Sequence, residues 1–270
     1  MLPILAFVVL TCAGSWLLWI AAAALMGWSF SFQTGLVAIG GPVYLLGVFV
    51  PALVAVAMSA RTEGRRAMET LLQRTLHWQV ALRWYVFAAA YYAAVKLGVT
   101  VLHRVVSGEY PALNQEPWFV MIAAVPFSTP FQAGEEIGWR GYLLPRLSAR
   151  IGLPLASLAV GVVWAAWHLP FFFIGGADKS GQSFPAYLLL VTALSVAMAW
   201  LYWRTRGSLL LTMLMHAAVN NTNFVSTPAS TAASPWTFRA PLVIWVTAGV
   251  MWTCALFFLA AMRGKTLDLE

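Results

Sequence analysis

Charged residues are scarce in this chain. Only 9% of its 270 residues are Asp, Glu, Lys or Arg, whereas 61% are hydrophobic, and the mean hydropathy is +0.78. Such a composition excludes an ordinary soluble domain, because too little polar surface is available to face water. Alternating ten-residue strands are also lacking. The apolar runs are continuous, which favours membrane helices over a β-barrel.

Cysteine is almost absent as well. Cys12 and Cys254 each lie inside an apolar run, so they form neither a disulfide framework nor a metal-ligand pattern. The net charge of +7 does not come from a basic stripe or tail, since the Lys and Arg residues lie between apolar runs. Basic residues in that position fix membrane orientation, and we therefore expect no nucleic-acid partner.

The apolar runs predict an all-α, polytopic membrane helical bundle. A spanning helix needs about 20 apolar residues. By that measure residues 1–270 form a single integral membrane domain with about eight transmembrane helices and no visible internal repeat. The predicted spans are 4–27, 35–58, 82–102, 117–139, 153–174, 184–203, 207–225 and 240–262.

Lys and Arg alternate between the two sides of these spans. Twelve fall in the connections on one side and in the C-terminal tail, against three in the opposite connections. This asymmetry predicts that both termini are cytoplasmic. The segment Arg61–His77 alternates basic and apolar residues, which predicts an amphipathic helix on the cytoplasmic surface.

Ionisable residues inside the spans are the candidate functional residues. Each costs at least about 2.5–3.5 kcal/mol at bilayer depth, so each needs a partner or a role. Glu136 and Arg140 are four residues apart, which suits an ion pair on one helix face. Glu135 is rotated by about 100° from Glu136, so Arg140 cannot serve both acids equally. One carboxylate is left for other work.

Histidines on two other spans complete the set. His216 and Asn220 lie one helical turn apart on the same face, and His168 precedes Leu169-Pro170 on a different span. Counted from the basic loops, these residues and Glu135 lie roughly 8–22 Å deep. We therefore expect one shared cavity that opens toward the cytoplasm. A carboxylate, two imidazoles and an amide in a low-dielectric cavity are suited to peptide hydrolysis.

At these residues the sequence resembles the CAAX prenyl protease and bacteriocin-processing (CPBP, Abi) family of intramembrane proteases. That family is marked by Glu-Glu-x-x-x-Arg, Phe-x-x-x-His and His-x-x-x-Asn/Asp on successive helices. The matching residues here are Glu135-Glu136-x-x-x-Arg140, Trp164-x-x-x-His168 and His216-x-x-x-Asn220. They lie in a core of about 117–225. Trp164 replaces the family's Phe, which we interpret as a change at a packing position.

The resemblance implies roles for these residues. Glu135 would activate water with His168 as its partner, His216 and Asn220 would bind the oxyanion or a metal, and Glu136 with Arg140 would hold the helix geometry. Glu135, His168 and His216 also match a catalytic zinc ligand set in composition. The family has been described both as metal-dependent and as metal-free, and the sequence leaves a divalent metal such as zinc as one alternative and no cofactor as the other.

The sequence thus predicts an endopeptidase that acts, in contact with membrane lipid, on a membrane-associated, prenylated or otherwise lipidated peptide or protein. Two other functions stay open. A non-catalytic scaffold or regulator of the same family could bind a membrane partner through this cavity. A proton- or metal-coupled transporter would also place Glu and His inside the membrane, but it requires a polar route to both faces. Lys96 we interpret as a snorkelling or helix-pairing residue.

Overall fold

The computed structural model describes residues 2–28, 40–222, 224–226 and 234–267, which are helical apart from turns, loops and one isolated bridge. The all-α class is therefore confirmed. The helices are α1 (Leu2–Leu25), α3 (Gly40–Thr62), α4 (Arg65–Gln73), η1 (Arg74–Leu76), α5 (Leu82–Ser107), α6 (Trp118–Ser128), η2 (Thr129–Gln132), α7 (Ala133–Glu136), η3 (Ile137–Leu143), α8 (Leu144–Trp167), η4 (Leu169–Phe172), α9 (Phe184–Arg204), α10 (Leu209–Asn221) and α11 (Leu242–Ala261).

Six helical runs in the described residues are long and apolar enough to cross a membrane. Five match expected spans one to one, in α1, α3, α5, α9 and α11, and residues 35–39 of the second expected span lie outside the described residues. The sixth, Trp118–Trp167, covers most of two expected spans, and α10 is a shorter apolar helix where the 207–225 span was expected. Gly152 has φ 76° and ψ 157° and interrupts the helical geometry inside α8, so the two expected spans lie on either side of it. Several long apolar helices indicate an integral, multi-pass membrane protein.

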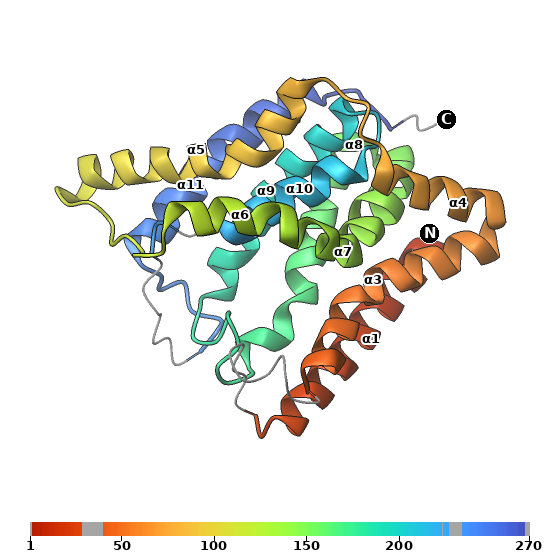
Figure 1. Ribbon diagram of the computed structural model, residues 1–270, viewed down its shortest axis with the longest axis horizontal. Coiled ribbons are helices and arrows are strands. Elements are labelled where there is room, and N and C mark those ends of the chain that lie inside the picture. The colour runs from red at the N-terminus through yellow and green to blue at the C-terminus, as the bar shows by residue number, and fades with distance from the viewer. Residues whose placement is uncertain (1, 29–39, 223, 227–233, 268–270) are drawn as a thin grey trace.

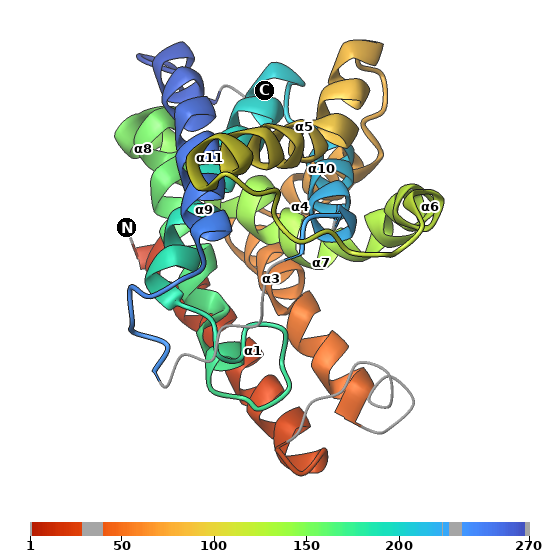
Figure 2. The same ribbon diagram turned by 90° about the vertical axis from the view of Figure 1, so that its left-hand side faces the viewer.

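Helix packing brings distant parts of the sequence together. α1 runs beside α3, and α8 packs on α9, which in turn contacts α11 (Figures 1 and 2). α5 packs on both α10 and α11. Gly138 allows η3 to pack closely against α3, since a Cβ at this position would lie 2.6–2.9 Å from atoms of Pro51 in α3. The core formed in this way surrounds the motif-bearing segments.

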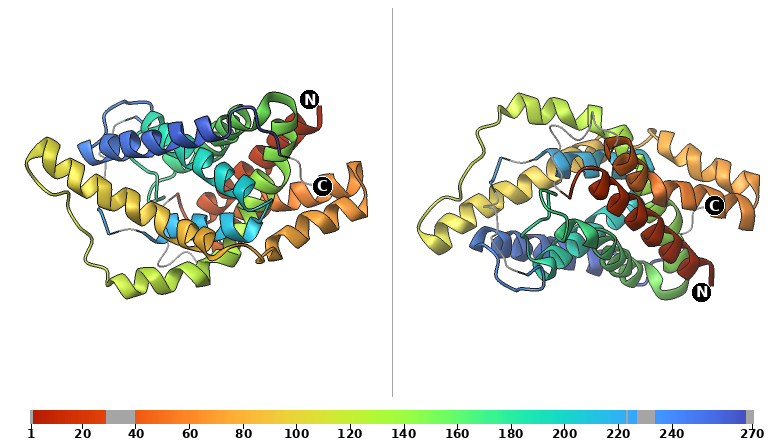
Figure 3. Two further views of the ribbon diagram at one scale, coloured as in Figure 1. Left: turned by 90° about the horizontal axis from the view of Figure 1, so that it is seen from above. Right: turned by 90° about the horizontal axis from the view of Figure 1, so that it is seen from below.

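The basic connections gather at one end of the bundle. Figure 3 shows that the chain enters α1 and leaves α11 at the same end as the α3–α4 connection, whereas the α5–α6 connection lies at the other end. Contacts join the basic connections to one another. Arg146 pairs with Glu63, the Ser208 hydroxyl donates to the His77 carbonyl at 2.6 Å, and the Leu153 amide donates to the Lys265 carbonyl at 2.9 Å. We call this the basic end.

The connections with few basic residues meet at the opposite end. The Ser183 hydroxyl caps α9 by accepting from the Ala186 amide, and it donates to the Thr237 carbonyl at 2.6 Å. A bridge joins Leu113, between α5 and α6, to Val225, between α10 and α11. The helices therefore run between two chemically different ends, as the alternation of Lys and Arg predicts.

The amphipathic segment at the basic end is also a helix. α4 covers Arg65–Gln73, and Leu71 is its one buried residue. Arg65 and Glu69 form an exposed ion pair on its outer side. The predicted helix is thus confirmed, although it is shorter than the predicted segment.

Candidate active site

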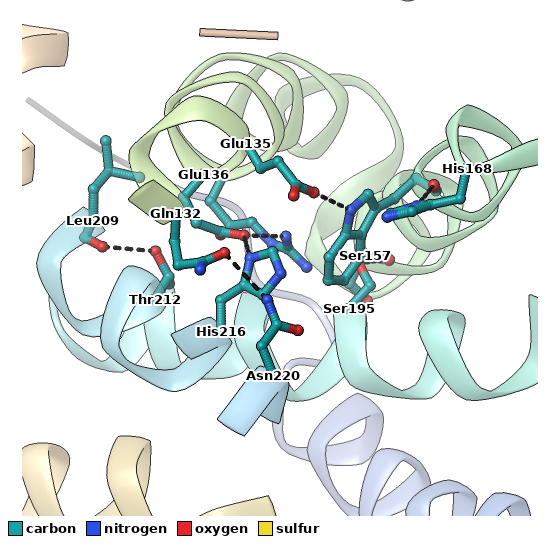
Figure 4. Close-up of polar contacts among 12 residues, drawn as sticks. Gln132, Glu135, Glu136, Ser157, His168, Ser195, Leu209, Thr212, His216 and Asn220 are labelled. Carbon is teal, nitrogen blue, oxygen red and sulfur yellow. Dashed lines mark hydrogen bonds and ion pairs between the residues drawn. The ribbon is translucent and has the colours of Figure 1, made fainter. Parts of the chain in front are cut away.

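The two adjacent glutamates lie in different environments. Glu136 is completely buried, and its Oε1 accepts from Arg140 Nη1 at 2.8 Å. Figure 4 shows Glu136 directed toward His216, whose Nδ1 lies 2.9 Å from the same oxygen, whereas Glu135 points away from this group. Arg140 lies in η3, a π-helical segment; such segments are frequent at functional sites. The predicted ion pair is therefore present, and Arg140 is completely buried.

Glu135 is held by Trp164. The indole Nε1 donates to Glu135 Oε2 at 2.7 Å, and it is the one hydrogen-bond donor to this carboxylate among the residues the structure describes. The Trp164 ring also receives the Arg140 guanidinium at 4.4 Å from its centre and the His216 ring at 5.1 Å. Trp164 therefore contacts Glu135 directly and the Glu136–Arg140 ion pair through Arg140. The sequence had indicated only a packing role for this side chain. A Phe at this position has no N–H and cannot make the bond to Glu135.

His168 approaches from the end of α8. Its Nδ1 lies 2.9 Å from the Trp164 carbonyl, and its ring centre lies 6.1 Å from that of Trp164. The described contacts include no direct hydrogen bond between His168 and Glu135. Trp164 therefore fixes both residues, one through its side chain and the other through its backbone.

Asn220 lies one turn beyond His216 on α10, as its spacing predicts (Figure 4). Its Nδ2 lies 3.4 Å from Oε1 of Gln132, a buried residue on η2. The sequence analysis did not single out Gln132. A signal was present, since Gln132 precedes Glu135 and Glu136 by three and four residues, the spacing of helix neighbours.

One cavity of about 870 Å³ brings the candidate residues together. Glu135, His168, His216 and Asn220 all line it. Trp164, Tyr187 and Lys96 also contribute to its wall. Lys96 therefore belongs to the same cavity as the two candidate motifs on α8 and α10, a connection that its position in the sequence did not reveal.

The cavity lies toward the end opposite the basic connections. α3 contributes Tyr44 and Val48 from its first turns, and α9 contributes Tyr187, whereas the arginines of both helices lie at their other ends. The lining also includes Asp178, whose side chain is 52% exposed. The described lining residues therefore lie in the half of the bundle away from the basic end. The cytoplasmic opening of the cavity stays a prediction, because depth along single helices does not tell which end a cavity reaches.

The donor set offers limited support for a metal ion. Zinc sites use three or four converging protein ligands. In the described ranges no three His, Cys, Asp or Glu side chains are grouped closely enough to hold a metal. The Nδ1 atom of His216 faces the Glu136 carboxylate, and the Glu135 carboxylate accepts from Trp164. The set of zinc ligands Glu135, His168 and His216 therefore stays a prediction.

Comparison with known proteins identifies the same segment. Residues 114–222 match the model of the type II CAAX prenyl endopeptidase Rce1-like family. The chain is also 28% identical over 108 residues to CAAX prenyl protease 2 of Methanococcus maripaludis. That alignment covers 38% of this chain and 37% of the relative. All six candidate site residues lie within the family match. The segment 114–222, which carries these residues, is therefore similar to the Rce1-like type II CAAX prenyl endopeptidase family.

Proposed function

We propose that this protein is an intramembrane endopeptidase that hydrolyses a peptide bond of a membrane-associated or lipidated substrate. The observation that carries the proposal is the separation of the two acids. Glu136 forms a buried ion pair with Arg140. Glu135 instead lines a cavity of about 870 Å³ together with His168, His216 and Asn220. A carboxylate that faces a cavity and is held by a single indole is free to act on a bound water molecule.

Glu135 acts as the general base in this proposal. Its carboxylate takes a proton from water while the water oxygen attacks the peptide carbonyl carbon, and the carbonyl oxygen becomes an oxyanion. The protonated Glu135 then gives this proton to the amide nitrogen as the C–N bond breaks, so that a carboxylic acid and an amine are released. The hydrogen bond from Trp164 holds the carboxylate in one orientation throughout.

His216 and Asn220 are positioned to stabilise the oxyanion. The Asn220 amide supplies N–H donors, and a protonated His216 donates from both ring nitrogens. Its Nδ1 faces the Glu136 carboxylate at 2.9 Å, which leaves Nε2 as the donor for the substrate. Arg140, completely buried, balances the Glu136 charge and keeps this group in place.

We infer that the chain crosses the membrane eight times, with the basic end in the cytoplasm. Both termini are then cytoplasmic, and the cavity opens on the opposite face of the membrane. This proposal departs from the expected cytoplasmic opening, and it is supported by the cavity lining, which lies away from the basic end. A cavity lined at one end also favours an enzyme over a transporter, which needs a route to both faces.

Cleavage of a quenched fluorescent lipopeptide library tests the function. The library includes prenylated, acylated and unmodified peptides, and the purified protein is reconstituted in lipid. We expect wild-type protein to cleave some of these peptides, Glu135→Gln to abolish cleavage, and Glu109→Gln, at an exposed acid, to leave it unchanged. Failure of wild-type protein to cleave any peptide would favour the scaffold function.

Cysteine labelling tests the orientation independently of activity. In a Cys12→Ala/Cys254→Ala background, Lys179→Cys places a thiol at the cavity mouth and Glu63→Cys places one at the basic end. We expect a membrane-impermeant maleimide to label the first variant in intact cells and the second after the membrane is opened. The reverse order would put the cavity mouth in the cytoplasm.

A further inference from the structure

Lys96 is a buried cation in the wall of the candidate active-site cavity. It lies in the middle of α5 and is only 7% exposed, and it lines the same cavity as His216 and Asn220. These two residues are carried by α10, which packs directly against α5. Lys96 is therefore on a wall adjacent to the wall that carries the candidate oxyanion donors.

Lys96 has no carboxylate partner in the part of the chain that the structure describes. Its ammonium lies 5.3 Å from the centre of the Tyr92 ring, a cation–π contact. The two carboxylates in the described lining of the cavity have other partners. Asp178 pairs with Lys179 at 2.7 Å, and Glu135 accepts a hydrogen bond from Trp164. An unpaired ammonium in a low-dielectric cavity attracts an anionic group of whatever enters.

The shape of the cavity indicates which anionic group this is. Its volume of about 870 Å³ lies within the range of pockets that enclose a ligand of drug-like size, roughly 300–1,000 Å³. Its lining residues come from one half of the bundle, with none from the connections at the basic end. The anionic group that every peptide substrate carries, whatever its side chains, is the carboxylate at its C-terminus. A positive charge in it selects a carboxyl terminus over an amino terminus.

We propose that Lys96 is a specificity-determining residue that binds the C-terminal carboxylate of the substrate. This inference rests on the proposed function, since it places the substrate's free end in the same cavity as Glu135. The ammonium donates hydrogen bonds to the carboxylate, and the Tyr92 ring keeps the lysine side chain extended into the cavity. Lys96 takes no part in bond cleavage.

Paired peptides with a free C-terminal acid or a C-terminal amide test this proposal. Wild-type protein should prefer the acid, and Lys96→Met should raise KM for the acid by about 10- to 100-fold with kcat and the amide KM nearly unchanged. Lys96→Arg should restore much of the preference. Lys265→Met, at an exposed lysine outside the cavity lining, is the matched control and should keep the preference. An amide peptide with an internal Glu distinguishes a side-chain carboxylate from the chain terminus.

An equal rise in KM for acid and amide peptides in Lys96→Met would overturn the proposal. An unchanged preference of this variant for the acid peptide would also overturn it. Thermal unfolding of each variant shows whether the protein remains folded. If wild-type protein cleaves no peptide, binding of the acid and amide peptides is compared directly, with and without Lys96→Met. Selective binding of the acid that depends on Lys96 would then support the proposal although the proposed protease function had failed. Equal binding of both peptides would reject it.

Discussion

Replacement of Arg140 by Met should strongly destabilise the fold. Arg140 and Glu136 are both completely buried, and their ion pair joins Nη1 and Oε1 at 2.8 Å. Arg140→Met leaves the Glu136 carboxylate buried without its guanidinium partner. Breaking a buried pair in this way costs about 3–5 kcal/mol. For a chain of this size, such a loss lowers the melting temperature by on the order of 10 °C.

The double variant Glu136→Gln/Arg140→Met gives the sharper result. It removes both charges, so it should be more stable than Arg140→Met alone, with a coupling energy of about 1–3 kcal/mol. His216 remains beside Glu136 in Arg140→Met, since its Nδ1 lies 2.9 Å from Oε1 of that carboxylate.

Thermal unfolding in lipid nanodiscs, with intrinsic tryptophan fluorescence as the signal, measures these effects. Arg65→Met is the matched control, because Arg65 and Glu69 have the same spacing but lie on the exposed side of α4. This variant should change stability by less than about 0.5 kcal/mol. The argument that burial sets the energy of this ion pair would be refuted by either of two results. One is purely additive effects of Glu136→Gln and Arg140→Met on stability, and the other is an equal loss of stability in Arg140→Met and Arg65→Met.

Three further results are expected. Trp164→Phe removes the hydrogen bond to Glu135 and should lower kcat by about tenfold while the protein stays folded; an unchanged kcat would mean that the indole N–H does not orient the base. Gly138→Ala should destabilise the protein, because a Cβ there would meet Pro51, whereas Gly249→Ala, with open space around its Cβ, should not; thermal unfolding compares the two. Cleavage in the presence of a metal chelator should persist if Glu135 works without a metal, and its complete loss, restored by added zinc, would support the alternative ligand set.

Much of the fold could be read from the sequence. Long apolar runs must become helices in lipid, because a backbone without water can satisfy its hydrogen bonds only internally. The alternation of Lys and Arg likewise predicted which connections share an end of the bundle. Spacings of four residues placed Glu136 beside Arg140 and His216 on the same face as Asn220, since the helical repeat fixes these relations within one element.

Relations between helices were decided only by the tertiary structure. Trp164 could be recognised as a member of the motif, but its bond to Glu135 joins two segments 29 residues apart. Lys96 shares a cavity with His216 because α5 packs on α10, and no periodicity within α5 encodes that contact. The half of the bundle that holds the cavity is likewise encoded in no single helix, because it depends on how several helices converge. The sequence determines the helices and the faces of each, and packing determines which faces meet.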